Sequence, residues 1–298
     1  AVGDVPERRE QEPNDPVPAD VVPRAETFLP VPPPHELPIV LNGQIMPGDT
    51  DRFRFAANKG QKLVIETKAR RLVPYLADAV PGWFQAVMTV YDEQGRELAY
   101  ADDYRFSPDP VLYFEVPRHG TYILEIRDAV YRGREDFVYR VSISEKPFVT
   151  AMFPLGARKG ETAYVSVSGW NLPKKTVKLD TSAPGGRREL VLTGHYGRSN
   201  PVYYRVDTLP EVRETGSNND AVHAQPVTLP VIVNGRIEAG GDVDVFRING
   251  SAGDRIVLEI DARRLQSSLD SLLRVTDEAG DVIAWNDDHM EKHGRSEE

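Results

Sequence analysis

The sequence contains no cysteine. This excludes disulfide frameworks, thiol nucleophiles and cysteine-ligated metal sites, and it leaves the compartment open. No apolar run approaches the ~18 residues that span a bilayer, so we expect no direct membrane insertion. The 298-residue chain also lacks a long run of lysine or arginine, and its formal net charge is −10. We therefore expect no nucleic-acid partner, because nothing offers a phosphate-binding face.

Helical periodicity is nearly absent, whereas short runs of alternating apolar and polar residues recur along the chain. Such runs are typical of strands with one buried face. They lie at 51–57, 62–68, 86–92, 111–116, 121–126, 137–143, 163–169, 202–207, 244–248 and 255–260. Only 68–79 and 261–271 are candidates for a short helical turn. The sequence thus predicts an all-β fold of tandem β-sandwiches.

Two parts of the chain repeat each other. Residues 37–72 match 229–265, and residues 88–103 match 273–288. The start of the chain, "VPERREQEPND", likewise resembles "LPEVRETGSNND", which follows the middle region. Similarity of this kind indicates two copies of one structural unit.

The second copy lacks three alternating runs that complete the first, at 111–116, 121–127 and 137–143. Unpaired strand edges and an uncovered apolar face tend to recruit another strand. We expect the natural chain to continue beyond residue 298 and supply these strands; the other expectation is that a neighbouring chain donates them. On this view the chain begins and ends inside a repeating pattern.

Sequence motifs of common enzymes are missing. The chain has no His-Glu-x-x-His, no Gly-x-Ser-x-Gly and no phosphate-binding glycine loop that opens a helix. We therefore expect a protein that is not an enzyme.

An Asp-x-Asp pair stands directly before an alternating run in both copies. Asp49 and Asp51 lie in "GDTDRFRF", and Asp242 and Asp244 lie in "GDVDVFRI". Residues two apart in an extended chain point to the same side, so each pair can present two carboxylates together. Two interpretations stay open. The pair contributes to a cation site, or it makes ordinary turns by accepting hydrogen bonds from nearby backbone amides.

Several motifs together resemble the bacterial pre-peptidase C-terminal domain family. They are "EPND", "NGQI", "GDTDRFRF", "KGQKLVIE", "VYDEQGRELAYADD" and "HGTYILEI". The resemblance covers 10–145, with an incomplete second copy at 209–288. The stretch "FVTAMFPLGARKGETAYVSVSGWNL" at 148–172 resembles immunoglobulin-like domains of the IPT/TIG type.

The resemblance implies four parts of the chain. They are the tail of a preceding module (1–9), a jelly-roll-like sandwich (10–146), an immunoglobulin-like sandwich (147–208) and an incomplete second sandwich (209–298).

Collagenase-type members of the family bind calcium where an acidic N-terminal segment meets the Asp-x-Asp strand. The resemblance implies a first ligand set of Glu10, Glu12, Asn14, Asp15, Asp49 and Asp51. A poorer second set is Glu214, Asn219, Asp220, Asp242 and Asp244, where Ser217 replaces Glu12 and one residue is inserted. Oxygen-rich groups suit calcium, which takes about six to eight oxygen ligands and tolerates irregular geometry.

The family also implies a secreted, cell-surface or periplasmic protein. We expect a non-catalytic spacer or adhesion segment, stiffened by calcium, whose partners are further modules or neighbouring copies. The alternative is a module that targets an attached hydrolase to polysaccharide or protein fibres. Its candidate contacts are Tyr75, Trp83 and Phe84, in an insertion that the second copy lacks. An exposed aromatic row favours targeting, and buried aromatic rings favour a spacer.

Overall fold

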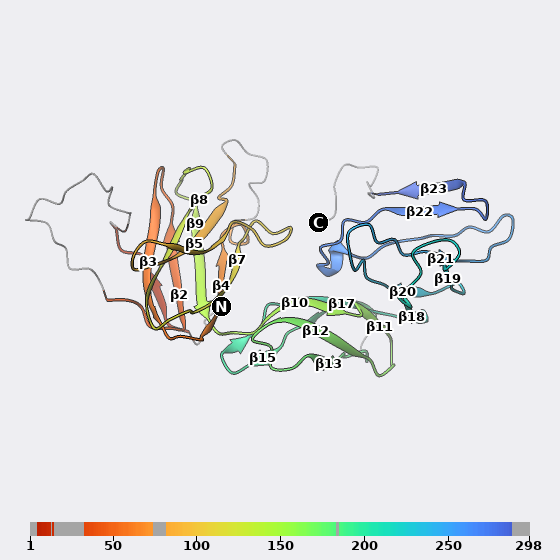
Figure 1. Ribbon diagram of the computed structural model, residues 1–298, viewed down its shortest axis with the longest axis horizontal. Coiled ribbons are helices and arrows are strands. Elements are labelled where there is room, and N and C mark those ends of the chain that lie inside the picture. Colours follow the sequence, from red (N-terminus) through yellow and green to blue (C-terminus); the bar gives the residue numbers. More distant parts are fainter. Residues whose placement is uncertain (1–4, 13, 15–32, 74–81, 183–184, 288–298) are drawn as a thin grey trace, which may run out of the picture. The chain divides into compact units, whose positions relative to one another are not determined.

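The computed structural model is all-β, as the sequence predicts (Figure 1). It describes residues 5–12, 14, 33–73, 82–182 and 185–287. Within these ranges the helical structure is one 3-10 turn, η1 (Arg263–Leu265), which lies in one of the two stretches expected to turn. No described helix has the length and apolar character needed to cross a membrane. The chain divides into two compact units, 1–148 with 194–198 and 149–193 with 199–298.

The first unit is a sandwich of two sheets (Figure 1). One sheet has the order β1-β2-β9-β4-β7, with β1 (Glu7–Arg9), β2 (Ile39–Gln44), β9 (Val138–Ser144), β4 (Lys62–Lys68) and β7 (Val111–Glu115). The other has the order β3-β8-β5-β6, with β3 (Thr50–Ala57), β8 (Gly120–Asp128), β5 (Ala86–Asp92) and β6 (Glu97–Ala101). Neighbouring strands are antiparallel, except that β1 runs parallel to β2.

Alternation in the sequence explains how the two sheets pack. In β3, Phe53 and Phe55 are buried while Arg52 and Arg54 are only partly covered, because successive side chains point to opposite faces. The buried residues of both sheets form one apolar core. Glu125 on β8 accepts a hydrogen bond from Arg52 on the outer face, so the charged residues there are paired.

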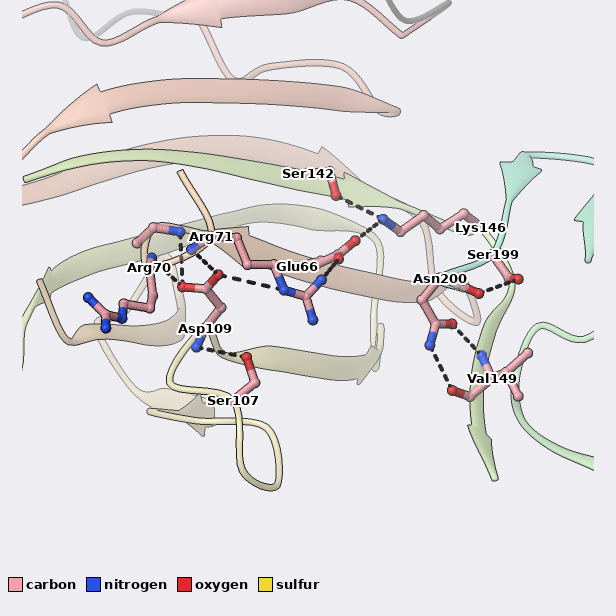
Figure 2. Close-up of polar contacts among 11 residues, drawn as sticks. Glu66, Arg70, Arg71, Ser107, Asp109, Ser142, Lys146, Val149, Ser199 and Asn200 are labelled. Carbon is pink, nitrogen blue, oxygen red and sulfur yellow. Dashed lines mark hydrogen bonds and ion pairs between the residues drawn. The ribbon is translucent and has the colours of Figure 1, made fainter. Parts of the chain in front are cut away.

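Two buried carboxylates hold the loops of this unit (Figure 2). Asp109 accepts hydrogen bonds from the backbone amides of residues 69, 70 and 71, at 3.0, 2.6 and 3.1 Å. Glu66 on β4 pairs with Lys146, which also donates to Ser142 at 3.2 Å. Burial is the largest influence on the pKa of Glu66 and works to raise it, but the charge and hydrogen bond of Lys146, together with the charges of Lys68 and Arg71, hold the pKa below its ordinary value. Both buried carboxylates thus have hydrogen-bond or ion-pair partners.

The second unit begins with two three-stranded sheets around a separate apolar core. One contains β10 (Phe148–Phe153), β12 (Tyr164–Trp170) and β13 (Thr176–Lys178); the other contains β11 (Gly156–Arg158), β17 (Val202–Asp207) and β14 (Gly186–Leu190). The intervening chain forms a small hairpin of β15 (Thr193–Gly194) and β16 (Gly197–Arg198), of which residues 194–198 are grouped with the first unit. Asn200 exchanges two hydrogen bonds with the backbone of Val149 (Figure 2). The immunoglobulin-like assignment of this region stays a prediction.

The rest of the second unit, as far as residue 287, contains three short strand pairs. They are β18 (Glu211–Arg213) with β20 (Ile232–Asn234), β19 (Gln225–Pro226) with β21 (Phe246–Arg247), and β22 (Leu273–Thr276) with β23 (Val282–Asn286). The expected strand at 255–260 is absent, so that prediction was wrong for the structure described. Its counterpart β4 is a strand because β7 and β9 pair with it on both sides. No described strand does this for 255–260.

One pair of repeated sequence segments forms the same turn in both units. Asp92 accepts hydrogen bonds from the amides two and four residues later, at 2.9 and 3.0 Å. Asp277 does the same, at 2.9 Å for both. These carboxylates hold matching hairpin turns, as expected for Asp at the start of a turn.

Candidate metal centre

The candidate site lies where the N-terminal segment meets the start of β3. The segment runs along β2, with the Val40 amide donating to the carbonyl of Pro6 at 2.9 Å. The Glu10 amide then donates to the carbonyl of Asn42 at 3.0 Å. These bonds extend the parallel β1–β2 pairing and carry Glu10 to the end of β2. Two segments that are distant in sequence thereby close one site.

Asp51 is the buried centre of this site. It is fully buried, and its Oδ2 accepts a hydrogen bond of 2.5 Å from the hydroxyl of Tyr139 on β9. Glu10 is half-buried and accepts from the Gln44 amide at 3.0 and 3.1 Å. Gly43 makes the close approach possible, because a methyl group there would overlap both the Glu10 carboxylate and the Tyr139 hydroxyl.

Carboxylates accumulate at this site. Burial raises the pKa of Asp51 to about 8, against the hydrogen bond from Tyr139, and the neighbouring Glu10 and Asp49 carboxylates add to the rise. Burial also raises the pKa of Glu10. The pKa of Tyr139 lies well above its ordinary value, chiefly because of burial and then because of Asp51. A carboxylate held in this way is stabilised by any cation that reaches it.

The oxygen atoms needed for a cation are close together. Glu10, Glu12 and Asp51 each offer a carboxylate oxygen within 4.8 Å of the others. Oδ1 of Asp51 is buried and has no hydrogen-bond partner among the described residues. The same holds for both amide atoms of Asn14, whose backbone amide donates to Glu12 at 2.9 Å. Unsatisfied buried oxygens beside clustered carboxylates fit a hard cation such as calcium.

The two aspartates of the first pair have different roles. Asp49 accepts from the amide of Met46 at 3.0 Å and closes the turn before β3. Turn chemistry, one of the two interpretations of the motif, therefore describes Asp49. Asp51 bonds to the side chain of Tyr139, and no described backbone amide donates to it. Asp15, the remaining member of the first set, lies outside the described residues.

The second copy builds part of the same arrangement. The Glu214 amide donates to the carbonyl of Asn234 at 3.0 Å, as Glu10 does in the first copy. Asp242 closes the turn by accepting from the amide of Glu238 at 2.7 Å. Burial raises the pKa of Asp244 to about 6, and the neighbouring Glu214 and Asp242 carboxylates contribute.

The structure aligns the second ligand set with the first differently from the sequence prediction at one residue. Asn218, four residues after Glu214, takes the place of Asn14, which lies four residues after Glu10. Asn218 is 1% exposed, and its amide atoms lack a partner among the described residues. Asn219 is exposed, and Asp220 is an exposed acid bonded to His223. The insertion thus falls after Asn218 rather than before it, and the counterpart of Glu12 is Gly216.

The aromatic insertion does not form an exposed row in the described residues. Phe84 is buried and stacks on Phe137, with 5.3 Å between ring centroids. Trp83 is half-buried, and the guanidinium of Arg70 lies 5.3 Å from its ring centroid. The hollow beside Trp83 has a volume of about 10 Å³, which accommodates one water but no sugar ring. Tyr75 lies outside the described residues.

Two residues of the site were missed by sequence reasoning. Tyr139 lies in an alternating run and was expected only as a strand residue. Asn218 was passed over for its neighbour Asn219. Tyr139 had no local signal, since its role depends on β9 lying beside β2. The repeat did carry a signal for Asn218, namely its equal spacing from Glu214.

Comparison with known proteins gives partial likenesses. No family model matches the chain. The sequence is 32% identical over 80 residues to a probable subtilase-type serine protease of Deinococcus radiodurans. That match covers 27% of this chain and spans only 10% of the length of the curated relative.

Among solved structures, the chain is similar to the pre-peptidase C-terminal domain of a Bacillus anthracis collagenase. The TM-score is 0.27 at 15% identity, covering 38% of this chain and 99% of that domain. It is also similar to the periplasmic inhibitors of g-type lysozyme from Aeromonas hydrophila and Salmonella Typhimurium. Their TM-scores are 0.24 and 0.23 at 18% and 20% identity, each covering 35% of this chain and 84% of the inhibitor. Likenesses at these TM-scores assign no function.

Proposed function

We propose that the first unit is a non-catalytic module of an exported protein, whose N-terminal segment is fixed to the sandwich by calcium. One observation carries the proposal. Glu10, Glu12 and Asp51 bring carboxylate oxygens within 4.8 Å of one another, and Oδ1 of the buried Asp51 lacks a hydrogen-bond partner within the described chain. A bound cation neutralises this cluster and supplies the missing partner.

The ligands come from two different segments. Glu10 and Glu12 belong to the N-terminal segment, whereas Asp51 belongs to β3 of the sandwich. A cation held by all three therefore links a chain end to a folded core. Asn14 offers an amide oxygen from the same segment, and its amide atoms are buried. Calcium suits such a set better than magnesium, because it accepts more oxygen ligands in less regular geometry.

A non-catalytic role agrees with the groups in the described residues. The raised pKa values of Glu10, Asp51 and Asp244 belong to carboxylates of the two acidic clusters, which suit cation binding. The curated relative is a probable protease, of which the match covers 10%. An accessory segment of a secreted protein is compatible with a match of that size. Localisation at the cell surface, in the periplasm or in the medium belongs to this proposal.

A spacer or adhesion role is favoured over targeting to polysaccharide or protein fibres. The described aromatic residues of the insertion pack within the unit: Phe84 stacks on Phe137, and the ring of Trp83 lies under Arg70. Further modules or neighbouring copies are the partners that this role implies.

Calcium titration of the full chain tests the proposal. At 100 times its dissociation constant, calcium should raise the free energy of unfolding by about 2.7 kcal/mol relative to chelator. Asp51→Asn should abolish that increment, since it removes the charge and one potential ligand oxygen. Asp103→Asn is the matched control, because Asp103 is an exposed acid outside the cluster. An unchanged melting temperature, together with no bound calcium by elemental analysis, would refute the proposal.

A further inference from the structure

Residues 255–260 of the second unit form an exposed apolar segment, "RIVLEI". Val257 is 90% exposed, and Ile256, Leu258 and Ile260 are exposed as well. In the first copy the corresponding residues Leu63, Val64 and Ile65 are each 0% exposed. The same sequence pattern is therefore buried in one unit and uncovered in the other.

The backbone of this segment is also open. In the first copy, β4 lies between β7 and β9 and bonds to both. Within the described residues, no backbone–backbone hydrogen bond reaches 255–260. The carbonyl of Ile260 accepts from the Arg264 side chain at 3.3 Å. A segment whose other amides and carbonyls lack backbone partners, beside apolar side chains, is a template for pairing with another strand.

The order of charges along the segment identifies the strand that fits. Arg255 and Glu259 flank three apolar residues. When two such segments pair antiparallel about Val257, Arg255 of each lies opposite Glu259 of the other, and Ile256 lies opposite Leu258. The first copy uses this kind of pair, since Lys62 on β4 faces Glu115 on β7. Opposite charges directly across an antiparallel pair are stabilising, and like charges are destabilising.

We propose that two molecules of this chain associate by antiparallel pairing of residues 255–259, with Val257 on a twofold axis. Such an interface is isologous, so each favourable contact occurs twice. Glu259 contacts Arg264 of its own molecule, but both side chains are more than half exposed, so Glu259 exchanges this partner readily. The pairing covers Val257 and gives both backbones hydrogen-bond partners along one edge.

Sedimentation velocity and light scattering of the full chain over a range of concentrations test this pairing. The wild-type chain should show a monomer–dimer equilibrium. Glu259→Arg places two arginines opposite each other at both ends of the pair and should weaken dimerisation by about tenfold or more. The double variant R255E/E259R reverses both charges and should restore the wild-type dissociation constant. Val257→Lys, which places like charges on the axis, should give a monomer.

A matched control distinguishes this strand pairing from nonspecific association of exposed apolar residues. Val222 is 86% exposed but lies outside the segment, so Val222→Lys should leave the dimer unchanged. Because Val222 and Val257 are both exposed, circular dichroism should show that both variants fold. Four results would overturn the proposal: a monomer at every concentration, a dimer insensitive to V257K, no rescue by the double variant, or open-ended aggregates. A synthetic peptide of residues 137–146 contains β9, which pairs with β4 in the first copy. Binding of this peptide to a monomeric chain would show instead that the segment pairs with a strand like β9.

Discussion

Gly43→Ala probes the packing that brings the N-terminal segment against the sandwich. A methyl group at this position would overlap the carboxylate of Glu10 and the hydroxyl of Tyr139. Tyr139 is 2% exposed and bonded to Asp51, so it has little room to move. Glu10 lies on a terminal segment beside β2 and is the group that should give way. The substitution therefore separates Glu10 from Asp51.

The expected cost has two parts. Forcing a methyl group into a well-packed site typically costs about 1–3 kcal/mol. Displacement of Glu10 also removes one of the three clustered carboxylates. The chain then loses the increase in the free energy of unfolding that calcium supplies, about 2.7 kcal/mol at 100 times the dissociation constant. We expect Gly43→Ala to lower the free energy of unfolding by about 1–3 kcal/mol in chelator and by about 4–6 kcal/mol in calcium.

Hydrogen exchange in β2 and β3 reports this unit separately from the rest of the chain. Exchange should be measured in chelator and in calcium, with urea unfolding alongside. Gly120→Ala is the matched control, because a methyl group there meets no atom within 4 Å. The reasoning fails if Gly43→Ala matches the control under both conditions, since Glu10 and Tyr139 would then leave room for the methyl group.

Three further substitutions test the other buried polar groups. Tyr139→Phe removes the hydroxyl that donates to Asp51, and urea unfolding in chelator should show a loss of about 1–3 kcal/mol. Asp109→Asn weakens a carboxylate that accepts from three consecutive amides, and those amides should lose exchange protection. Burial works to raise the pKa of Asp128, but hydrogen bonds from Arg132 hold it below its ordinary value. That stability is present above pH ~4 and is lost as the pH falls through the lowered pKa, so Asp128→Asn should be destabilising at pH 7 and progressively less so as the pH falls below ~4.

Six strands of the first unit, namely β3, β4, β5, β7, β8 and β9, were predictable because each carries its own signal, whereas β1, β2 and β6 were not among the expected runs. Period-2 alternation in "DRFRFAA" places Phe53 and Phe55 on one side, and the sandwich buries that side. Asp92 and Asp277 each accept from amides within four residues, so the signal for their turns is also local. Properties of this kind depend on a few neighbouring residues, so a single sequence contains them.

Features that depend on distant segments were harder to predict. The segment 255–260 has the sequence of a strand, but a strand also needs partners, and the described residues provide none. Tyr139 reaches Asp51 only through the pairing of β9 with β2. The register after Glu214 was misjudged because Asn218 and Asn219 are adjacent; the spacing of Asn218 from Glu214, equal to that of Asn14 from Glu10, distinguishes them, and burial agrees.

The parallel pairing of β1 with β2 has a mechanical consequence. When tension is applied to the chain ahead of β1, the pull acts along the strand, while its backbone hydrogen bonds point sideways toward β2. The hydrogen bonds that residues 6–10 make to β2 are then loaded together in shear, instead of opening one at a time from an end. β18 and β20 repeat this arrangement with Pro210 and Glu214, so it occurs twice in the described part of the chain. A cation bound between Glu10 and Asp51 would raise the force needed to separate β1 from β2, because it lies beside the hydrogen bond of the Glu10 amide that ends their pairing.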